Sequence, residues 1–429
     1  MGSDRSAFGA ALPLGKPRLS LGDLGLLALL LLVFVGIAPF EVRDANALLH
    51  GADESGAGNL ARQLSYLAVF AAAGIAAARA YGWRILRAVP IPFLLVLGWC
   101  IASAAWTAEP YVTLRRAALE CIVVAAVFLS VETVGTSRSL RWLRWILAGV
   151  LIVNWLSIPL VPQAIHLTGE TDPGLVGDWR GLYFHKNIAG AVCALSALVF
   201  FFSFLETRRW WDAVLFASAA AFAAMTQSKT SIILLPVALA AGLAYRLAWR
   251  RALDRQIALV AFAWLAFVAG AAAIFEWNAI ANLLANPEQL TGRTEIWRAE
   301  LAFIADHPWL GSGFGSFADT GAGSPLRHYI GSAWIANISH GHSGYLQLLV
   351  TIGGIGFVLA MAALIVWPAL RFLKADDDRL ALKSLLFAIF VFVVFHNVLE
   401  SDWLEGDGAA WVSFLLAMAM LKNIRGDAI

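Results

Sequence analysis

Residues 187–205 read NIAGAVCALSALVFFFSFL, a run without a single charged side chain. About 20 mainly apolar residues cross the hydrocarbon core of a bilayer as one helix. This run therefore predicts a membrane-spanning helix, and comparable runs recur along the whole chain. We predict twelve such helices, at about 22–40, 62–80, 90–106, 114–132, 142–160, 187–205, 211–226, 231–248, 257–275, 345–368, 382–399 and 408–422.

The composition also indicates a membrane protein. Of the 429 residues, 60% are hydrophobic and only 14% are charged, whereas soluble domains are about half apolar and a quarter charged. We therefore expect an all-α, polytopic membrane protein with one integrated membrane domain. Its predicted parts are helices one to nine within residues 1–275, including an external loop at about 161–186, a lobe at 276–344, and helices ten to twelve within 345–429.

Basic residues predict the orientation, because cytoplasmic loops of membrane proteins are enriched in Lys and Arg. With both termini in the cytoplasm, 21 of the 31 Lys and Arg residues fall in inside segments and 10 fall outside. This requires the first apolar run to be a retained helix and not a cleaved signal peptide. The long segment 276–344 then lies outside. Since it is rich in Trp and Phe, we expect an ordered lobe that contains short helices and packs on the membrane domain.

The stretch that begins at Arg293 contains charges in an unusual position. If it is a helix, Trp297, Leu301 and Ile304 share an apolar side, and Arg293 and Glu300 project onto that side as well. A charge on a packed face is costly unless it is paired or used. One interpretation is that Arg293 holds an anion in an internal cavity. The alternatives are an Arg293–Glu300 ion pair and an Arg293 exposed to solvent.

Glycines at 311, 313 and 315 follow this stretch. Glycine permits tight or left-handed backbone. No strand precedes them, so a nucleotide-binding loop is not indicated, and a turn that packs the lobe is favoured.

Two histidines, His340 and His342, lie where the chain re-enters the membrane. An imidazole titrates near neutral pH and can take a proton from an attacking hydroxyl. A hydrogen-bonding interfacial role is an equal alternative. A metal site is disfavoured, since the His-x-His pair lacks a clear third ligand.

Further external polar residues form three groups. Arg180 and Lys186 flank the start of the helix at 187–205, where they could bind phosphate or lipid headgroups. Arg115 and Arg116 form a second cationic group. Glu400 follows the helix at 382–399, where an acid could orient a base or cap the helix.

The order of these motifs resembles the O-antigen ligase and polymerase superfamily over residues 95 to 420. One departure is Ser343 after the motif histidine, where the family commonly has Asn. The distance from His342 to Tyr345 favours His342 over His340 as the motif histidine. The matching motifs are Arg180…His185-Lys186-Asn187, Gly292-Arg293…Trp297, His307-Pro308…Gly311-Ser312-Gly313…Phe317 and His342…Tyr345-Leu346, with Trp106…Pro110…Arg115-Arg116 and Asn397…Glu400-Ser401 as flanking features.

The resemblance implies transfer of a glycan from a polyprenyl diphosphate to an acceptor hydroxyl, at the periplasmic face of a bacterial inner membrane. It implies no cofactor, no metal ion and no nucleotide sugar. His342 would be the base, and Arg293 and Arg180 would stabilise the diphosphate leaving group. The implied substrate-binding residues are Arg115, Arg116, His185, Lys186, Asn187, Arg298, His340, Tyr345 and Glu400.

Within this superfamily the His-Lys-Asn variant and the length favour a polymerase of exopolysaccharide or O-antigen repeat units. The alternative is an O-antigen ligase that transfers glycan to lipid A-core. Expected partners are the lipid-linked donor, the glycan or lipid A-core acceptor, membrane lipids, a chain-length regulator and export machinery, with no nucleic acid. A transporter or flippase is the alternative of another class. It is disfavoured because the polar residues concentrate in outer loops and not at the bilayer midplane.

Overall fold

The computed structural model describes residues 19–41, 59–168, 170, 173–248, 293–318, 320, 323–330, 341–373 and 379–424. The predicted helix at 257–275 and His340 lie outside this part of the chain.

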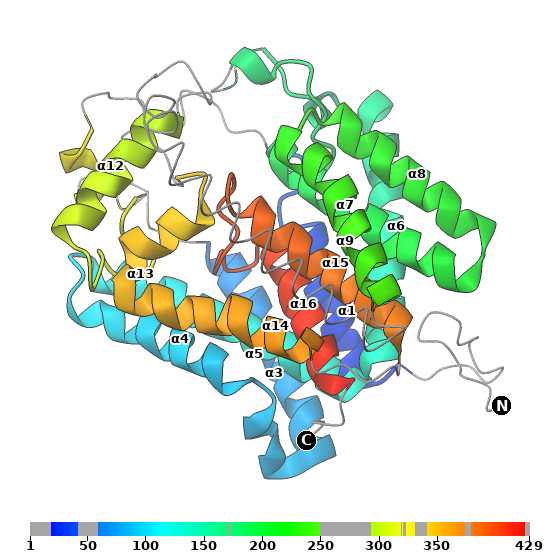
Figure 1. Cartoon of the computed structure of the whole chain (residues 1–429), viewed down its shortest axis with the longest axis horizontal. Coiled ribbons are helices and arrows are strands. Elements are labelled where there is room, and N and C mark those ends of the chain that lie inside the picture. Colours follow the sequence, from blue (N-terminus) through cyan, green and yellow to red (C-terminus); the bar gives the residue numbers. More distant parts are fainter. Residues whose placement is uncertain are drawn as a thin grey trace.

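The described elements are helical (Figure 1), apart from one isolated bridge between Ile165 and Trp179. Six helices are long and apolar enough to cross a membrane, and five shorter apolar helices accompany them. The all-α polytopic architecture is thereby confirmed. The α-helices are α1 (Leu21–Phe34), α3 (Leu60–Tyr81), α4 (Ile91–Ala102), α5 (Pro110–Val134), α6 (Thr136–Leu160), α7 (Lys186–Thr207), α8 (Trp210–Met225), α9 (Lys229–Ala248), α12 (Arg293–Asp306), α13 (Gly344–Met361), α14 (Trp367–Leu373), α15 (Leu380–His396) and α16 (Ala409–Asn423).

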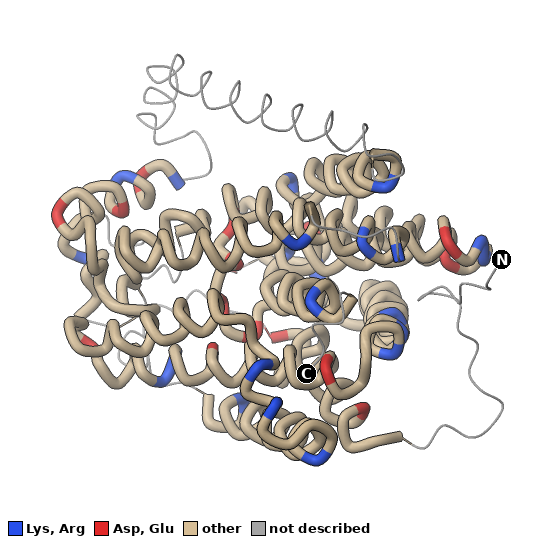
Figure 2. The backbone as a smooth tube through the Cα atoms, turned by 60° about the horizontal axis from the view of Figure 1, so that its bottom comes forward, with Lys and Arg blue, Asp and Glu red and all other residues tan. Residues whose placement is uncertain are grey.

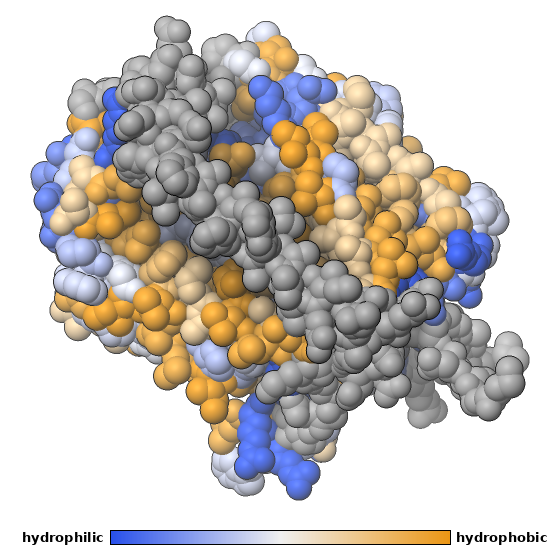
Figure 3. Space-filling view, viewed as in Figure 1, coloured by the Kyte–Doolittle hydropathy of each residue, from blue (hydrophilic) through white to orange (hydrophobic). Residues whose placement is uncertain are grey.

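Helix α7 is central to the bundle. Helices α6, α8, α9, α15 and α16 contact it, and most of its residues are buried. Large apolar side chains cover much of the outside of the bundle, as the orange areas of Figure 3 show on one face. An apolar outer surface of this kind is what a bilayer requires, because lipid tails offer no hydrogen bonds.

Three ion pairs with buried carboxylates connect helices at one end of the bundle. They connect the start of α1 with the start of α6, the body of α6 with the start of α8, and the end of α5 with the end of α16. This is the end that the basic residues predict to be cytoplasmic. Figure 2 marks the charged positions. The pairs are Asp23–Arg138 at 2.7 Å, Arg144–Asp212 at 2.6 Å and Glu132–Lys422 at 3.1 Å.

Helix α13 is interrupted at Gly353, whose φ of 66° is not helical. The interruption leaves the carbonyls of Val350 and Thr351 free to accept hydrogen bonds from Ser312 and Gly313, both at 2.9 Å. A broken helix is tolerated in a membrane where other backbone groups satisfy it. The glycine-rich loop is therefore a turn that packs against α13, as predicted. Gly311, Gly313 and Gly315 in this loop have φ values of 68°, 101° and 68°.

Within 276–344, the short helices that the structure describes are α12 and the turn η7 (Pro325–His328). Phe303 on α12 packs with Phe317, Leu326 and Val350, the last of which belongs to α13. The predicted packed side of α12 is partly wrong, because Leu301 is 44% exposed. The buried side of α12 instead includes Ala299, a small residue that packs in the same cluster as Phe317 and Val350. This side consists of Thr294, Ile296, Ala299, Glu300 and Phe303.

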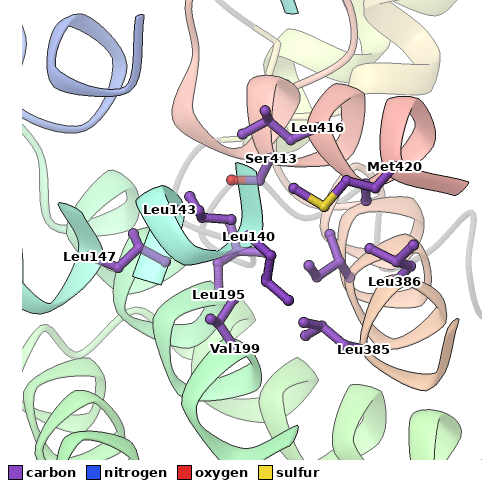
Figure 4. A pocket seen from close by; sticks show the side chains of 12 residues that line it. Leu140, Leu143, Leu147, Leu195, Val199, Leu385, Leu386, Ser413, Leu416 and Met420 are labelled. Atoms are coloured by element: carbon purple, nitrogen blue, oxygen red, sulfur yellow. The ribbon is translucent and has the colours of Figure 1, made fainter. Parts of the chain in front are cut away.

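A small cavity lies between α6, α7, α15 and α16 (Figure 4). Its volume of about 10 Å³ has room for about one water molecule. Leucines such as Leu195 and Leu386 line it, and no charged residue does. This cavity is an apolar packing gap and supplies no chemistry.

Candidate active site

The carboxylate of Glu400 collects side chains from three distant segments. Its Oε1 atom accepts a hydrogen bond from Arg293 Nη2 at 3.0 Å and another from Asn187 Nδ2 at 2.8 Å. Its Oε2 atom lies 3.5 Å from Nδ1 of His342. Glu400 lies in the loop that leads into α16, while Lys422 lies near the end of that helix. The cluster is therefore at the opposite end of the bundle from the Glu132–Lys422 ion pair.

The loop that carries Glu400 is held by backbone and side-chain hydrogen bonds. Oδ1 of Asn397 accepts from the amides of Asp402 at 2.9 Å and Trp403 at 2.8 Å. The amide of Gly344 donates to the carbonyls of Asn397 at 2.9 Å and Glu400 at 2.8 Å. A Cβ at Gly344 would lie only 2.0 Å from Asn397 Oδ1. Glycine at this position thus lets the start of α13 dock on the loop, which brings His342 to Glu400.

Arg293, at the start of α12, is bound at two points. In addition to Glu400, it donates from Nη1 to the carbonyl of Leu399 at 2.7 Å. A guanidinium has five N–H groups, and among the described residues only two of those of Arg293 have a partner. The Arg293 side chain is 16% exposed. The alternative of an Arg293–Glu300 pair is wrong, because the partner of Arg293 is Glu400.

His342 lies where a general base could reach a substrate, because its side chain is 32% exposed. Its backbone is left-handed, with a φ of 52°. A carboxylate only accepts hydrogen bonds, so a neutral His342 that binds Glu400 carries its proton on Nδ1. The lone pair on Nε2 is then available for the proton of a hydroxyl group.

The start of α7 is capped by two imidazoles. Nδ1 of His185 accepts from the amide of Asn187 at 3.1 Å, and Nε2 of His166 accepts from the amide of Lys186 at 3.2 Å. The ammonium of Lys186 binds Asp178 Oδ2 at 2.6 Å. The His-Lys-Asn motif therefore orders the helix start and, through Asn187, reaches Glu400.

Arg180 is fully buried and connects segments of the loop that precedes α7. Its Nε donates to the carbonyl of Gln163 at 2.6 Å, and its Nη1 donates to the carbonyl of Phe184 at 3.1 Å and to Glu170 at 3.2 Å. Burial lowers its pKa, which the charge of Glu170 opposes. Among the described residues its Nη2 has no partner. Arg180 thus holds the residue before His185 and lies one step from the Glu400 cluster.

Three of the remaining predicted residues, Arg115, Arg116 and Tyr345, contact groups outside the Glu400 cluster. Nη1 of Arg116 donates to the carbonyl of Gly315, and Arg115 lies 5.9 Å from the ring centre of Tyr111. The hydroxyl of Tyr345 donates to the carbonyl of Val394 at 2.8 Å. Arg116 and Tyr345 thereby hold the glycine-rich loop and the start of α13. Arg298 is exposed on α12.

The cluster strongly favours an ionised Glu400. Burial raises the pKa of this carboxyl, but the hydrogen bond from His342 and the charge of Arg293 outweigh burial and bring the pKa to about 2. Burial lowers the pKa of His185 to about 3, although the charge of Glu400 opposes this shift. At neutral pH the site therefore contains a carboxylate, a guanidinium and a neutral His185.

Several residues of this region were not predicted from the sequence. His166 binds Glu170 through Nδ1 at 2.8 Å, and no spacing signal in the sequence marks either residue. His396 joins Asp402 at 2.6 Å to Ser231 at 3.2 Å. That order of groups resembles a hydrolase triad, but Ser231 is fully buried, so a substrate has no access. The network instead ties α9 to the Glu400 loop. Within the described ranges, no group of three or more His, Cys, Asp or Glu side chains is arranged to hold a metal ion.

The fold and the site together define a class of protein: a multi-pass helical membrane protein with an acid–base cluster at one end of its bundle. Residues 213–361 match the family model described as O-antigen ligase. This segment includes Arg293 and His342. The match confirms the predicted resemblance to the O-antigen ligase and polymerase superfamily over this segment. It supports glycan transfer of that general type by a membrane glycosyltransferase. Among curated proteins, none matches the chain.

Proposed function

We propose that this protein transfers a glycan from a polyprenyl-diphosphate carrier to an acceptor hydroxyl at the periplasmic face of a bacterial inner membrane, as a polymerase of exopolysaccharide or O-antigen repeat units. The observation that carries the proposal is the meeting of Arg293, Asn187 and His342 on Glu400. A cation, an oriented base and an amide come together at the end of the bundle that is predicted to be periplasmic.

The reaction is a direct displacement at the anomeric carbon. Nε2 of His342 takes the proton of the acceptor hydroxyl, and the acceptor oxygen forms a bond to the anomeric carbon. The bond between that carbon and the diphosphate oxygen breaks, and its electron pair stays on the diphosphate. Inversion of the anomeric centre follows, and no carboxylate pair of the hydrolase type takes part.

Arg293 supports departure of the diphosphate. Negative charge grows on the leaving oxygen, and a cation already in place stabilises it without reorganisation. In this mechanism the three N–H groups of Arg293 that have no partner among the described residues bind phosphate oxygens. Because Arg293 supplies this charge, we propose a metal-independent reaction.

Glu400 positions the base and does not itself react. By accepting from Nδ1 of His342 it keeps the ring in the tautomer whose Nε2 is free, and its charge stabilises the imidazolium that forms. Arg180 acts one step further away, because it holds the Phe184 carbonyl next to His185.

A reconstitution assay tests the function. Purified protein in lipid nanodiscs receives a polyprenyl-diphosphate oligosaccharide, with chelator present, and either a second lipid-linked repeat unit or lipid A-core as acceptor. We expect a ladder of longer lipid-linked glycans with the first acceptor. Product on lipid A-core alone would instead make the protein a ligase.

Variants of the same protein connect the product to the site. His342→Ala and Arg293→Ala should each abolish product while the protein still folds. Arg293→Ala should also lower the unfolding temperature, because it leaves the Glu400 carboxylate without its cation. Full activity in either variant would remove that residue from the mechanism. Glycan that crosses proteoliposomes without a new glycosidic bond would show a transporter.

A further inference from the structure

Two histidines lie at the Glu400 cluster with opposite hydrogen-bonding roles. Nδ1 of His342 faces a carboxylate, which can only accept. Nδ1 of His185 faces the amide of Asn187 at 3.1 Å, which can only donate. Each ring therefore has a fixed tautomer, and the two tautomers differ. His342 presents a lone pair on Nε2, whereas His185 presents an N–H on Nε2.

The ring of His185 is held in place from several sides. The ring of His166 lies edge-on to it, with centres 5.7 Å apart, and His166 is itself fixed between the amide of Lys186 and Glu170. The His185 side chain is half-buried. No described residue accepts a hydrogen bond from its Nε2–H, so this donor is available to a ligand.

The surroundings keep this ring uncharged. Burial is the largest cause and lowers its pKa to about 3. The charges of His166, His342 and Lys186 act in the same direction, whereas the charge of Glu400 opposes them. His185 is thus a poor base at neutral pH. It is a donor of fixed direction, because protonation does not compete with its single N–H.

We propose that His185 donates its Nε2–H to a non-bridging oxygen of the diphosphate in the lipid-linked donor, beside Arg293. This inference rests on the proposed function, since it assigns a ligand to that same site. His185 is the N-cap of α7, a helix of 22 residues. The N-terminal end of a helix carries partial positive charge and favours an anion.

The cap also makes the donor stronger. The amide of Asn187 withdraws electron density from the ring at Nδ1, and chains of hydrogen bonds polarise one another. An anionic oxygen gains most from such a donor, because charge-assisted hydrogen bonds are about twice as strong as neutral ones. A phosphate oxygen is therefore a better ligand for His185 than a sugar hydroxyl.

Two substitutions separate the cap from the donor. His185→Asn keeps an acceptor for the Asn187 amide, since Asn is among the best N-cap residues, but it removes the Nε2–H. His185→Gln retains an N–H near the position of Nε2 and loses the short cap side chain. A purely structural His185 predicts that Asn is tolerated and Gln is not, and the proposal predicts the reverse order for ligand binding.

The measurement is binding of a polyprenyl diphosphate that carries no glycan, to the full-length protein in nanodiscs, with the polyprenyl alcohol as control ligand. We expect His185→Asn to weaken diphosphate binding about tenfold or more, with unchanged unfolding temperature and unchanged binding of the alcohol. His185→Gln should bind within about threefold of the parent and unfold at a lower temperature.

Unchanged diphosphate binding in His185→Asn would overturn the proposal, and so would a loss seen only when an acceptor glycan is added. Because this assay needs no turnover, it is independent of the reconstitution. If the parent protein forms no glycosidic product, the transfer function is refuted. The proposed contact between His185 and the diphosphate is then still decided by the binding measurement.

Discussion

Replacing Glu400 with Gln changes two atoms at the centre of the candidate site. The amide oxygen of Gln can still accept from Arg293 and Asn187, which share Oε1 in the parent. The other oxygen, which faces Nδ1 of His342 at 3.5 Å, becomes an NH₂ donor. His342 must then turn Nδ1 into an acceptor and place its proton on Nε2. In that tautomer His342 cannot take a proton from the acceptor.

The expected magnitude follows from this loss of a base. General-base catalysis contributes about 10²–10⁴ to a rate, which is about 3–5 kcal/mol of barrier. We expect kcat of Glu400→Gln to fall by about 10²–10³. KM for the lipid-linked donor should stay within about threefold, because Arg293 keeps its position. The free energy of unfolding should fall by about 1–3 kcal/mol, because the neutral amide keeps the two bonds to Oε1 but loses the charge interactions that lower the pKa of Glu400.

The assay is initial-rate glycan transfer by purified protein, with thermal unfolding recorded on the same samples. Asp407→Asn is the matched control, because Asp407 lies on the same loop and binds Arg62 at a partly exposed position. This control should keep kcat within about twofold. A Glu400→Gln enzyme with parental kcat would refute the tautomer argument, and so would equal losses in both variants.

Further predictions follow from three other positions. Arg293→Lys should lower kcat by about 10²-fold in the same transfer assay, since one ammonium cannot replace the forked contacts to Leu399 and Glu400; parental kcat would argue against a diphosphate cation. Burial raises the pKa of Glu300 from 4.5 to about 8. As the pH rises, the Glu300 carboxyl therefore loses its proton in the unfolded chain before it does so in the folded protein, and the stability of the parent falls between about pH 4.5 and 8. Glu300→Gln should therefore raise the unfolding temperature by an amount that grows across that window, and a pH-independent difference would contradict this. Gly353→Ala should lower the yield of folded protein in a detergent size-exclusion profile, because a Cβ there would lie 2.3 Å from the Trp309 carbonyl at a φ of 66°, whereas Gly98→Ala, with open space around it, should be tolerated.

The spanning helices follow from the sequence because the signal is local. A run such as 187–205 has only one way to satisfy its backbone in lipid, which is to form a helix within itself. Eleven of the twelve predicted helices correspond to described apolar helices. The glycine-rich turn was predictable for the same reason, since left-handed φ is a property of Gly311 and its neighbours alone.

The packed side of α12 was less predictable. Hydrophobicity pointed to Leu301, yet this residue is 44% exposed and Ala299 is buried. The partner surface decides which side of a helix packs, and here it is the cluster of Phe317, Leu326 and Val350. No count of apolar residues within α12 contains that information.

The sequence by itself determined a chain of apolar, membrane-spanning helices, and it supplied the motif residues from which a glycan-transfer site could be built. Only the tertiary structure decided how these residues pair. Glu400 binds Arg293, which is 107 positions away in the sequence, and Asn187, which is 213 positions away. Lys186 forms an ion pair with Asp178, and the buried Arg180 forms one with Glu170. Helix formation depends on neighbours along the chain, whereas the pairing of charges depends on which helix ends meet in space.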